Sequence, residues 1–293
     1  MKSGRAARLL LGLWGATAVL GQVPDPVPTT DAAIELFRAH RYPEARQVLE
    51  RIVAAQPRDA RACYYLGRTL ELRAEASALA EAVTWLQRAV ELEPNNPVYL
   101  GRYGGASLLL AERTTSPGAA RRGREAMERA VELNPDDLDA REGLLLFYQR
   151  APWPLGSRSR AKLHLEAIRQ RDPGRATVLE VLGRIRERDF AGAFRLCDQA
   201  LARNPEDYNA LFQIGATALA SGEQLERGVL ALQTCTKLTP PTPASPSISV
   251  VWQRLGTAQE KLRRPGEARA AYTEALRLDP GNREAAAALA ALM

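Results

Sequence analysis

Helix-stopping prolines return along the chain at a nearly regular interval, and this regularity limits the possible folds more than any other feature of the sequence. They stand at positions 57, 94, 135, 173, 205, 240 and 280, with spacings of 37, 41, 38, 32, 35 and 40 residues. Proline fixes its own φ, lacks a backbone N–H and biases the residue before it away from the helical region. The sequence therefore predicts a linear array of small units, each ending at one of these prolines.

The cleanest copy of the pattern begins Trp252-Gln-Arg-Leu-Gly256 and continues with Ala268, Tyr272 and Pro280. This pattern resembles the tetratricopeptide repeat, a helix-turn-helix unit of about 34 residues. Small residues at Gly256 and Ala268 let the two helices of such a unit approach closely. Tyr272 then fills the gap between units, and Pro280 stops the second helix.

The resemblance covers residues 31–280 and implies an all-α fold, a right-handed solenoid of about seven antiparallel helix pairs. The second, sixth and seventh units carry the pattern clearly, and the fourth and fifth are less regular. Residues 22–30 form a proline-rich leader that cannot be helical throughout. Residues 281–293 are rich in alanine, which has the highest helix propensity. We expect this segment to cap the array, because the last unit of a solenoid has to cover an apolar face.

The first 21 residues have the layout of a secretory signal peptide. Lys2, Arg5 and Arg8 precede an apolar run over residues 9–20, and the small residue Gly21 follows. The run has 12 residues, whereas a helix that crosses a bilayer needs about 20. Cleavage after Gly21 is therefore favoured, and the sequence predicts an exported protein in the periplasm. Retention of this segment as an inner-membrane anchor is the alternative.

The charge balance argues against a nucleic-acid partner. The chain has 40 basic and 34 acidic residues, a net charge of +6, and its isoelectric point is near 9.5. Part of the excess lies in the N-terminal segment, and without its three basic residues 37 basic residues face 34 acidic ones. Elsewhere charges of both signs alternate, as in residues 184–189, which is typical of a solvated helix face. We expect other proteins or peptides as partners, and a membrane only if the N-terminal segment is retained.

Residues that would indicate a chemical reaction are scarce. The only histidines are His40 and His164, which we expect in a solvated turn and on a helix surface. Cys63, Cys197 and Cys235 form no CxxC pair and have no histidine nearby, and the last two fall where the repeat places small packing residues. Motifs for nucleotide binding, zinc proteases and serine hydrolases are missing. We expect no catalytic residues, no cofactor, no metal and no small-molecule substrate.

Three segments depart from the bare repeat, at residues 113–119, 149–161 and 239–246. The first and third are polar and contain proline, so we expect simple loop expansions. The second holds Trp153 between two prolines, and its context resembles a loop of exported bacterial tetratricopeptide proteins, with Gly156-Ser157 in place of a Gly-Gly turn. Trp153 is costly to expose, so we expect it either to fill a wide gap between helices or to contact a partner.

A binding role requires the fewest features beyond the repeat pattern itself. In the family that the chain resembles, the first helices of the units line a concave groove, and such grooves take up extended or helical peptides. Besides Trp153, the candidate partner-binding residues on the first helices are Arg61, Tyr64, Arg68, Arg102, Phe212, Gln213, Gln253, Arg254 and Thr257. Arginine and tyrosine at these positions suit partners that offer acidic or backbone contacts.

The sequence therefore predicts a non-catalytic interaction scaffold or adaptor of the bacterial cell envelope. Two alternatives stay open, a membrane-tethered assembly factor and a structural envelope component that self-associates. An enzyme with a site at the Trp153 loop would need a constellation of titratable groups around that loop, and the sequence contains none there.

Overall fold

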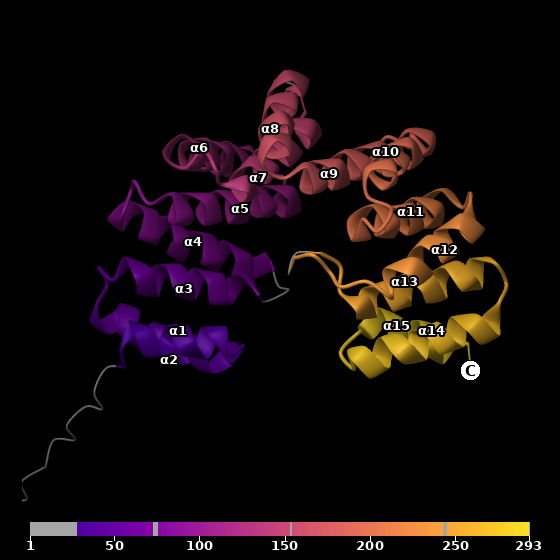
Figure 1. The fold of residues 1–293 in the computed structure, drawn as a ribbon. Coiled ribbons are helices and arrows are strands. Elements are labelled where there is room, and N and C mark those ends of the chain that lie inside the picture. Colours follow the sequence, from indigo (N-terminus) through magenta and orange to yellow (C-terminus); the bar gives the residue numbers. More distant parts are fainter. Residues whose placement is uncertain (1–27, 73–75, 153, 243–244, 293) are drawn as a thin grey trace, which may run out of the picture.

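The computed structural model describes residues 28–72, 76–152, 154–242 and 245–292, and all regular secondary structure in these ranges is helical. Fifteen helices follow one another in consecutive packed pairs (Figure 1). The first helices of units 1 to 7 are α1 (Thr30–Arg38), α3 (Ala60–Glu71), α5 (Pro97–Thr114), α7 (Leu138–Arg150), α9 (Pro173–Arg186), α11 (Tyr208–Ser221) and α13 (Ile248–Lys261). The second helices are α2 (Tyr42–Ala55), α4 (Ala76–Leu92), α6 (Pro117–Leu133), α8 (Arg158–Arg171), α10 (Phe190–Arg203), α12 (Leu225–Cys235) and α14 (Pro265–Leu278).

Aspartate side chains begin most of the first helices. Asp59, Asp137, Asp172 and Asp207 each accept a hydrogen bond from the backbone N–H three residues later, at 2.8 to 3.0 Å. These bonds satisfy N–H groups that a helix start leaves without an intrahelical partner. The helix-stopping prolines lie between the units, except that Pro173 is the first residue of α9. The turns between units are therefore specified locally by the sequence.

Within a unit, the two helices meet where a glycine of the first helix faces a large side chain of the second. A β-carbon on any of these glycines would lie 2.5 to 2.7 Å from the facing side chain. The four pairs are Gly67–Leu86, Gly104–Met127, Gly215–Leu232 and Gly256–Tyr272. Real β-carbons do not approach other atoms so closely, so these positions need glycine for the helices to pack as they do.

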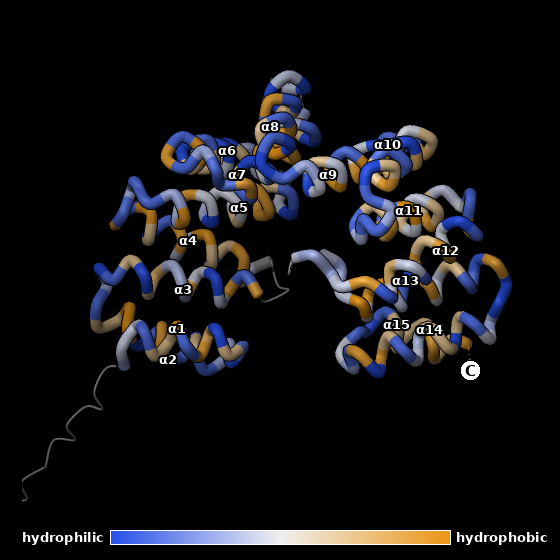
Figure 2. The backbone as a smooth tube through the Cα atoms, viewed as in Figure 1, coloured by the Kyte–Doolittle hydropathy of each residue, from blue (hydrophilic) through white to orange (hydrophobic). Residues whose placement is uncertain are grey.

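The pairs curve into an arch, with α1–α4 on one arm, α11–α15 on the other and α6–α9 between them (Figure 1). The last helix, α15 (Arg283–Ala291), packs on α14, where Ala285 is buried in one cluster with Tyr272 and Ala275. The predicted all-α solenoid of helix pairs with a C-terminal capping helix is confirmed. Figure 2 shows polar and apolar residues alternating along the helices of both arms. Across the described ranges, no helix is long and apolar enough to span a bilayer.

One predicted loop is mostly helix. The segment 113–119 was expected to be a loop expansion, but α5 continues to Thr114 and α6 begins at Pro117. Ser116 accepts a hydrogen bond from the N–H of Ala119, and the proline occupies the first turn of α6, where its missing N–H costs nothing. The extra residues therefore lengthen the two helices of unit 3. The described residues of the third predicted loop, 239–242 and 245–246, lie between α12 and α13, as expected. The signal peptide and Trp153 lie outside the described residues.

Candidate functional site

The first helices form the inner side of the arch. First helices of successive units pack on each other, α1 on α3, α5 on α7, α9 on α11 and α11 on α13. Each second helix packs on the first helix of its own unit and on the first helix of the next unit. Elements on the inner side of a curved array lie closest together, so this pattern of contacts places the first helices on the inner face.

Ion pairs join several of these first helices across the unit boundaries. The Arg61 guanidinium of α3 lies 2.8 Å from a carboxylate oxygen of Asp31 in α1. The Arg102 guanidinium of α5 lies 2.6 Å from a carboxylate oxygen of Glu71 in α3. In the middle of the array, Arg175 of α9 contacts Asp139 and Glu142 of α7 at 2.6 and 2.7 Å. These arginines of the inner face are therefore already paired with carboxylates of the chain itself.

The ion pairs change the interpretation of two candidate residues. Arg61 and Arg102 were expected to face acidic partners, and both are exposed, but each already has an internal carboxylate. The Glu71 side chain is only 10% exposed. Burial raises the pKa of Glu71, and the neighbouring Arg102 opposes that rise. Removing Arg102 would leave a buried carboxylate without its cation, so this pair is part of the fold.

Tyr64 and Arg68 form a packed group with aromatic neighbours. Tyr64 is buried and stacks on Tyr99 of the next unit, with ring centroids 4.8 Å apart. The Arg68 guanidinium lies over the Phe37 ring at 5.0 Å from its centroid, and the Arg68 Nε is buried without a hydrogen-bond partner. Tyr64 therefore stabilises the contact between units 2 and 3, and of these two candidate residues only Arg68 is partly exposed.

The remaining candidates lie in units 6 and 7, on the other arm of the arch (Figure 1). Phe212, Gln213 and Gln253 are buried. Arg254 and Thr257 are partly exposed, and Thr257 donates a hydrogen bond to the backbone oxygen of Gln253 at 3.1 Å. The structure therefore does not gather the candidates into one site. It divides them into a group on α3 and α5 and a group on α11 and α13.

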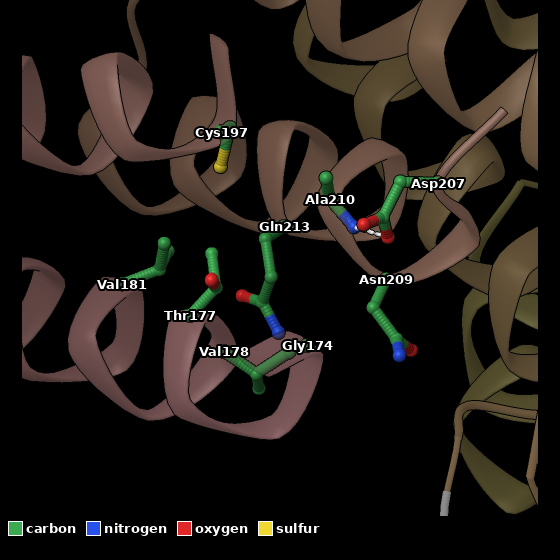
Figure 3. A pocket seen from close by; sticks show the side chains of 9 residues that line it. All are labelled: Gly174, Thr177, Val178, Val181, Cys197, Asp207, Asn209, Ala210 and Gln213. Atoms are coloured by element: carbon green, nitrogen blue, oxygen red, sulfur yellow. Dashed lines mark hydrogen bonds between the residues drawn. The ribbon is translucent and has the colours of Figure 1, made fainter. Parts of the chain in front are cut away.

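A small cavity opens between α9 and α11, and its lining includes Gln213. The cavity has a volume of about 10 Å³, and it is lined by Gly174, Thr177, Val178, Val181, Cys197, Asp207, Asn209, Ala210 and Gln213 (Figure 3). The Gln213 side-chain oxygen is buried and has no hydrogen-bond partner. Gln213 was among the residues predicted from the sequence, whereas Thr177 of α9 and Asn209 of α11 were missed because no motif marks them.

Exposed apolar side chains also occur on the first helices. Val98 is 56% exposed and Leu109 is 41% exposed, and both belong to α5. They are eleven residues apart, about three helical turns, so they lie on the same side of the helix. Such exposed side chains offer apolar contact to a binding partner.

His164 is not on a helix surface, contrary to the prediction. It is buried, and its ring stacks on Tyr148 with centroids 5.9 Å apart. Burial lowers the pKa of His164, the cations Arg141 and Arg160 lower it further, and Glu128 opposes the change. Tyr148 donates a hydrogen bond to Glu128 and accepts one from Arg160 at 2.9 Å. This group links α6, α7 and α8 of units 3 and 4.

Cys197 and Cys235 take the packing role expected from the sequence. Cys63, Cys197 and Cys235 are free and buried. Burial raises the pKa of Cys197 and of Cys235 to about 12, so both thiols stay protonated at neutral pH and are poor nucleophiles. Within the part of the chain that the structure describes, no group of three or more histidine, cysteine and acidic residues could hold a metal ion.

Two segments match sequence families, and both families are described as tetratricopeptide repeats. The matches cover residues 30–97, which form units 1 and 2 with the start of α5, and residues 249–282, which form most of unit 7. No curated protein sequence matches the chain significantly.

Solved structures show the same arrangement of helices. A tetratricopeptide repeat protein from Parabacteroides merdae superposes with a TM-score of 0.58 and 13% identity, over 90% of this chain and 96% of that one. Yeast Tom70 superposes with a TM-score of 0.63 and 14% identity, over 90% of this chain and 52% of Tom70. This chain therefore spans about half the length of Tom70. At these identities the likeness concerns the fold alone.

Proposed function

The chain is a tetratricopeptide-repeat protein, and from this premise we propose that it is a non-catalytic scaffold of the bacterial cell envelope. Repeat arrays of this kind mediate contacts between proteins. In this proposal the chain is exported, its N-terminal segment is removed after Gly21, and a peptide segment of a partner protein binds along the inner face of the arch.

The contacts between successive first helices are the observation that carries the proposal. Because α9 packs on α11 and α11 on α13, side chains of units 5 to 7 form a continuous surface on the inner side. A continuous surface of this kind suits a ligand that is itself linear, such as an extended or helical peptide. In units 3 and 4, where α5 packs on α7, the exposed Val98 and Leu109 of α5 supply apolar contacts to the same peptide.

The internal ion pairs restrict the chemistry of the partner. Arg61 and Arg102 are neutralised by Asp31 and Glu71, so an acidic peptide would have to compete with carboxylates of the chain itself. Recognition by apolar side chains and backbone hydrogen bonds avoids this competition. We therefore propose a partner segment that is apolar rather than strongly acidic in the part that contacts α3 and α5.

The export part of the proposal rests on the sequence, where three basic residues precede an apolar run and Gly21. Intact-mass measurement of the protein from fractionated producing cells tests it. An intact mass that corresponds to a chain beginning at Gln22, found in the soluble envelope fraction, supports export with cleavage. A chain with an unprocessed N-terminus in the membrane fraction would contradict cleavage and support a membrane-tethered scaffold instead.

The binding part is tested on the same sample by chemical cross-linking and identification of the captured proteins. The proposal predicts a small set of proteins that recur between preparations and disappear when Val98 and Leu109 are both replaced by aspartate. A matched control replaces Leu163 and Leu230, which are more exposed than Val98 and Leu109 but lie on the second helices α8 and α12. The proposal is contradicted if the Leu163 and Leu230 control also loses the captured proteins, or if the Val98 and Leu109 variant still captures them.

A further inference from the structure

The turn between units 4 and 5 differs from the other short turns of the array. In the turns that precede α3, α5, α7, α11 and α15, four residues separate the two helices. The second residue after the proline of each of these turns caps the next helix, and these caps are Asp59, Asn96, Asp137, Asp207 and Asn282. Between units 4 and 5 the single residue Asp172 both ends α8 and caps α9. Unit 5 is therefore attached to unit 4 in its own way.

Arg175 stands where the other turns have their capping residue, two positions after Pro173. An arginine side chain has no hydrogen-bond acceptor and cannot cap a helix start. Its guanidinium extends to α7 instead, where it donates to Asp139 at 2.6 Å and to Glu142 at 2.8 Å. At this position the chain thus has a cation that joins two units in place of a local cap.

Further polar contacts join α9 to unit 4. Arg186, at the other end of α9, donates to the side-chain oxygen of Gln149 in α7 at 2.7 Å. Arg169 of α8 lies 2.8 Å from a carboxylate oxygen of Glu180 in α9. Polar side chains therefore hold α9 against both helices of unit 4.

The buried apolar core is divided at α9. One large cluster of buried residues extends from Ala33 in α1 to Ala140 in α7, and another from Val181 in α9 to Ala271 in α14. In the smaller cluster between them, α9 supplies only Ala176 and Leu179 among the residues that the structure describes. Each arm of the arch therefore has a core of its own, and the angle between the arms depends on the contacts of α9.

We propose that the junction of α8 and α9 is a hinge between the two arms, and that Arg175 is an ionic strap that keeps the arch closed. Asp172 is the pivot, because it alone links the two helices. The strap joins α7 to α9, two first helices on the inner face, so its release lets the arms move apart. Because α3 and α5 lie on one side of the hinge and α11 and α13 on the other (Figure 1), the hinge sets the distance between the two groups of candidate residues. This inference does not depend on the proposed function.

Salt is the direct means of releasing such a strap. The Asp139 side chain is 90% exposed, and those of Arg175 and Glu142 are 29% and 30% exposed, so ions of the solvent reach the group. The screening length falls from about 30 Å at 0.01 M salt to about 3 Å at 1 M. Apolar contacts inside the arms are not weakened by this screening. High salt should therefore open the hinge while each arm keeps its fold.

Distance measurements between two spin labels by pulsed electron paramagnetic resonance test the hinge. The labels are attached through an unnatural amino acid at Gln47 in α2 and Ala270 in α14, two exposed positions on opposite arms. The control pair is Gln47 and Arg122 of α6, which lie on the same side of the hinge. Between about 0.01 and about 1 M sodium chloride, the distance across the hinge should lengthen while the control distance stays constant. An unchanged distance across the hinge, or an equal change in the control pair, overturns the proposal.

Variants show whether Arg175 is the strap. Arg175→Gln should give the long distance already at low salt, with the helix content unchanged in circular dichroism. The matched control is Arg61→Gln, because Arg61 also joins two first helices through an ion pair, with Asp31. Reversal of the pair, Arg175→Glu together with Glu142→Arg, should restore the short distance and its dependence on salt. The proposal is overturned if Arg175→Gln leaves the distance unchanged, if Arg61→Gln lengthens it equally, or if the reversed pair does not restore it.

Discussion

The close approach of the two helices in unit 7 can be tested with one methyl group. In Gly256→Ala the new β-carbon would lie 2.5 Å from Cε1 and 2.7 Å from Cδ1 of Tyr272. Tyr272 is completely buried, and its hydroxyl donates to Glu260 and contacts the Thr257 hydroxyl at 3.2 Å. The hydroxyl end of the buried ring is thus held by two side chains of α13, which keeps the ring from turning away, so the helices have to separate.

The expected magnitude combines two opposing effects. Overpacking a well-packed site costs about 1 to 3 kcal/mol, and the fixed ring places Gly256→Ala at the upper end. Replacing glycine by alanine inside a helix raises the free energy of unfolding by about 1 kcal/mol, because alanine has the higher helix propensity. The free energy of unfolding should therefore fall by about 2 kcal/mol. Gly183→Ala is the matched control, because Gly183 lies inside α9 and the nearest atom to its β-carbon is the Arg186 Nη2 at 3.9 Å.

The two variants carry the same chemical change, yet their stabilities should differ by about 3 kcal/mol. Gly183→Ala should gain about 1 kcal/mol from helix propensity alone. Urea unfolding followed by circular dichroism measures both, and a calorimetric scan shows whether the array unfolds in one step. Equal stabilisation of both variants would refute the argument that Gly256 is required by the approach of Tyr272.

Three further predictions concern other parts of the array. Because burial lowers the pKa of His164, the unfolded chain binds a proton more readily than the folded chain below about pH 6.5, so the urea midpoint should fall as the pH is lowered from that value. His164→Phe should make the urea midpoint less dependent on pH, and an unchanged pH dependence in this variant would contradict the prediction. Arg102→Met should lower the free energy of unfolding by about 1 to 2 kcal/mol, because it leaves buried Glu71 without its partner. Adding Glu71→Met to this variant should restore most of the loss in a double-mutant cycle, whereas additive losses from the two substitutions would contradict a stabilising pair. Arg263 has a φ of 59°, so Arg263→Asn should raise the unfolding free energy by about 0.5 to 1 kcal/mol in thermal unfolding, and a decrease would be inconsistent with strain in that turn.

The fold could be predicted from the sequence because its signals are local. The prolines between units and the small residues inside them act within a few residues of their own positions. The error at residues 113–119 arose where Ser116-Pro117 was taken as a loop signal, although a serine followed by proline is also the start of a helix. Composition alone cannot separate these two meanings, because both use the same residues.

The candidate site was harder to predict, because exposure depends on residues one repeat away. Tyr64 is buried by Tyr99 of the next unit. The carboxylates that neutralise Arg61 and Arg102 lie 30 and 31 residues earlier, at Asp31 and Glu71. Opposite charges separated by about one repeat length were a usable signal, since first helices of neighbouring units lie close together. The cavity at Gln213 depends on the exact distance between α9 and α11, which no pattern in the sequence specifies.

Site-specific photo-cross-linking in the producing cell tests the central claim most directly, that partners bind on the inner face. A photoreactive amino acid is placed at Val98 or Leu109 on the first helix α5, and in separate strains at Leu163 on α8 or Leu230 on α12. All four side chains are more than 40% exposed, so their accessibility to a partner is comparable. The account predicts cross-linked partner proteins from α5 and none from α8 or α12. Partners captured only from α8 or α12 would contradict it.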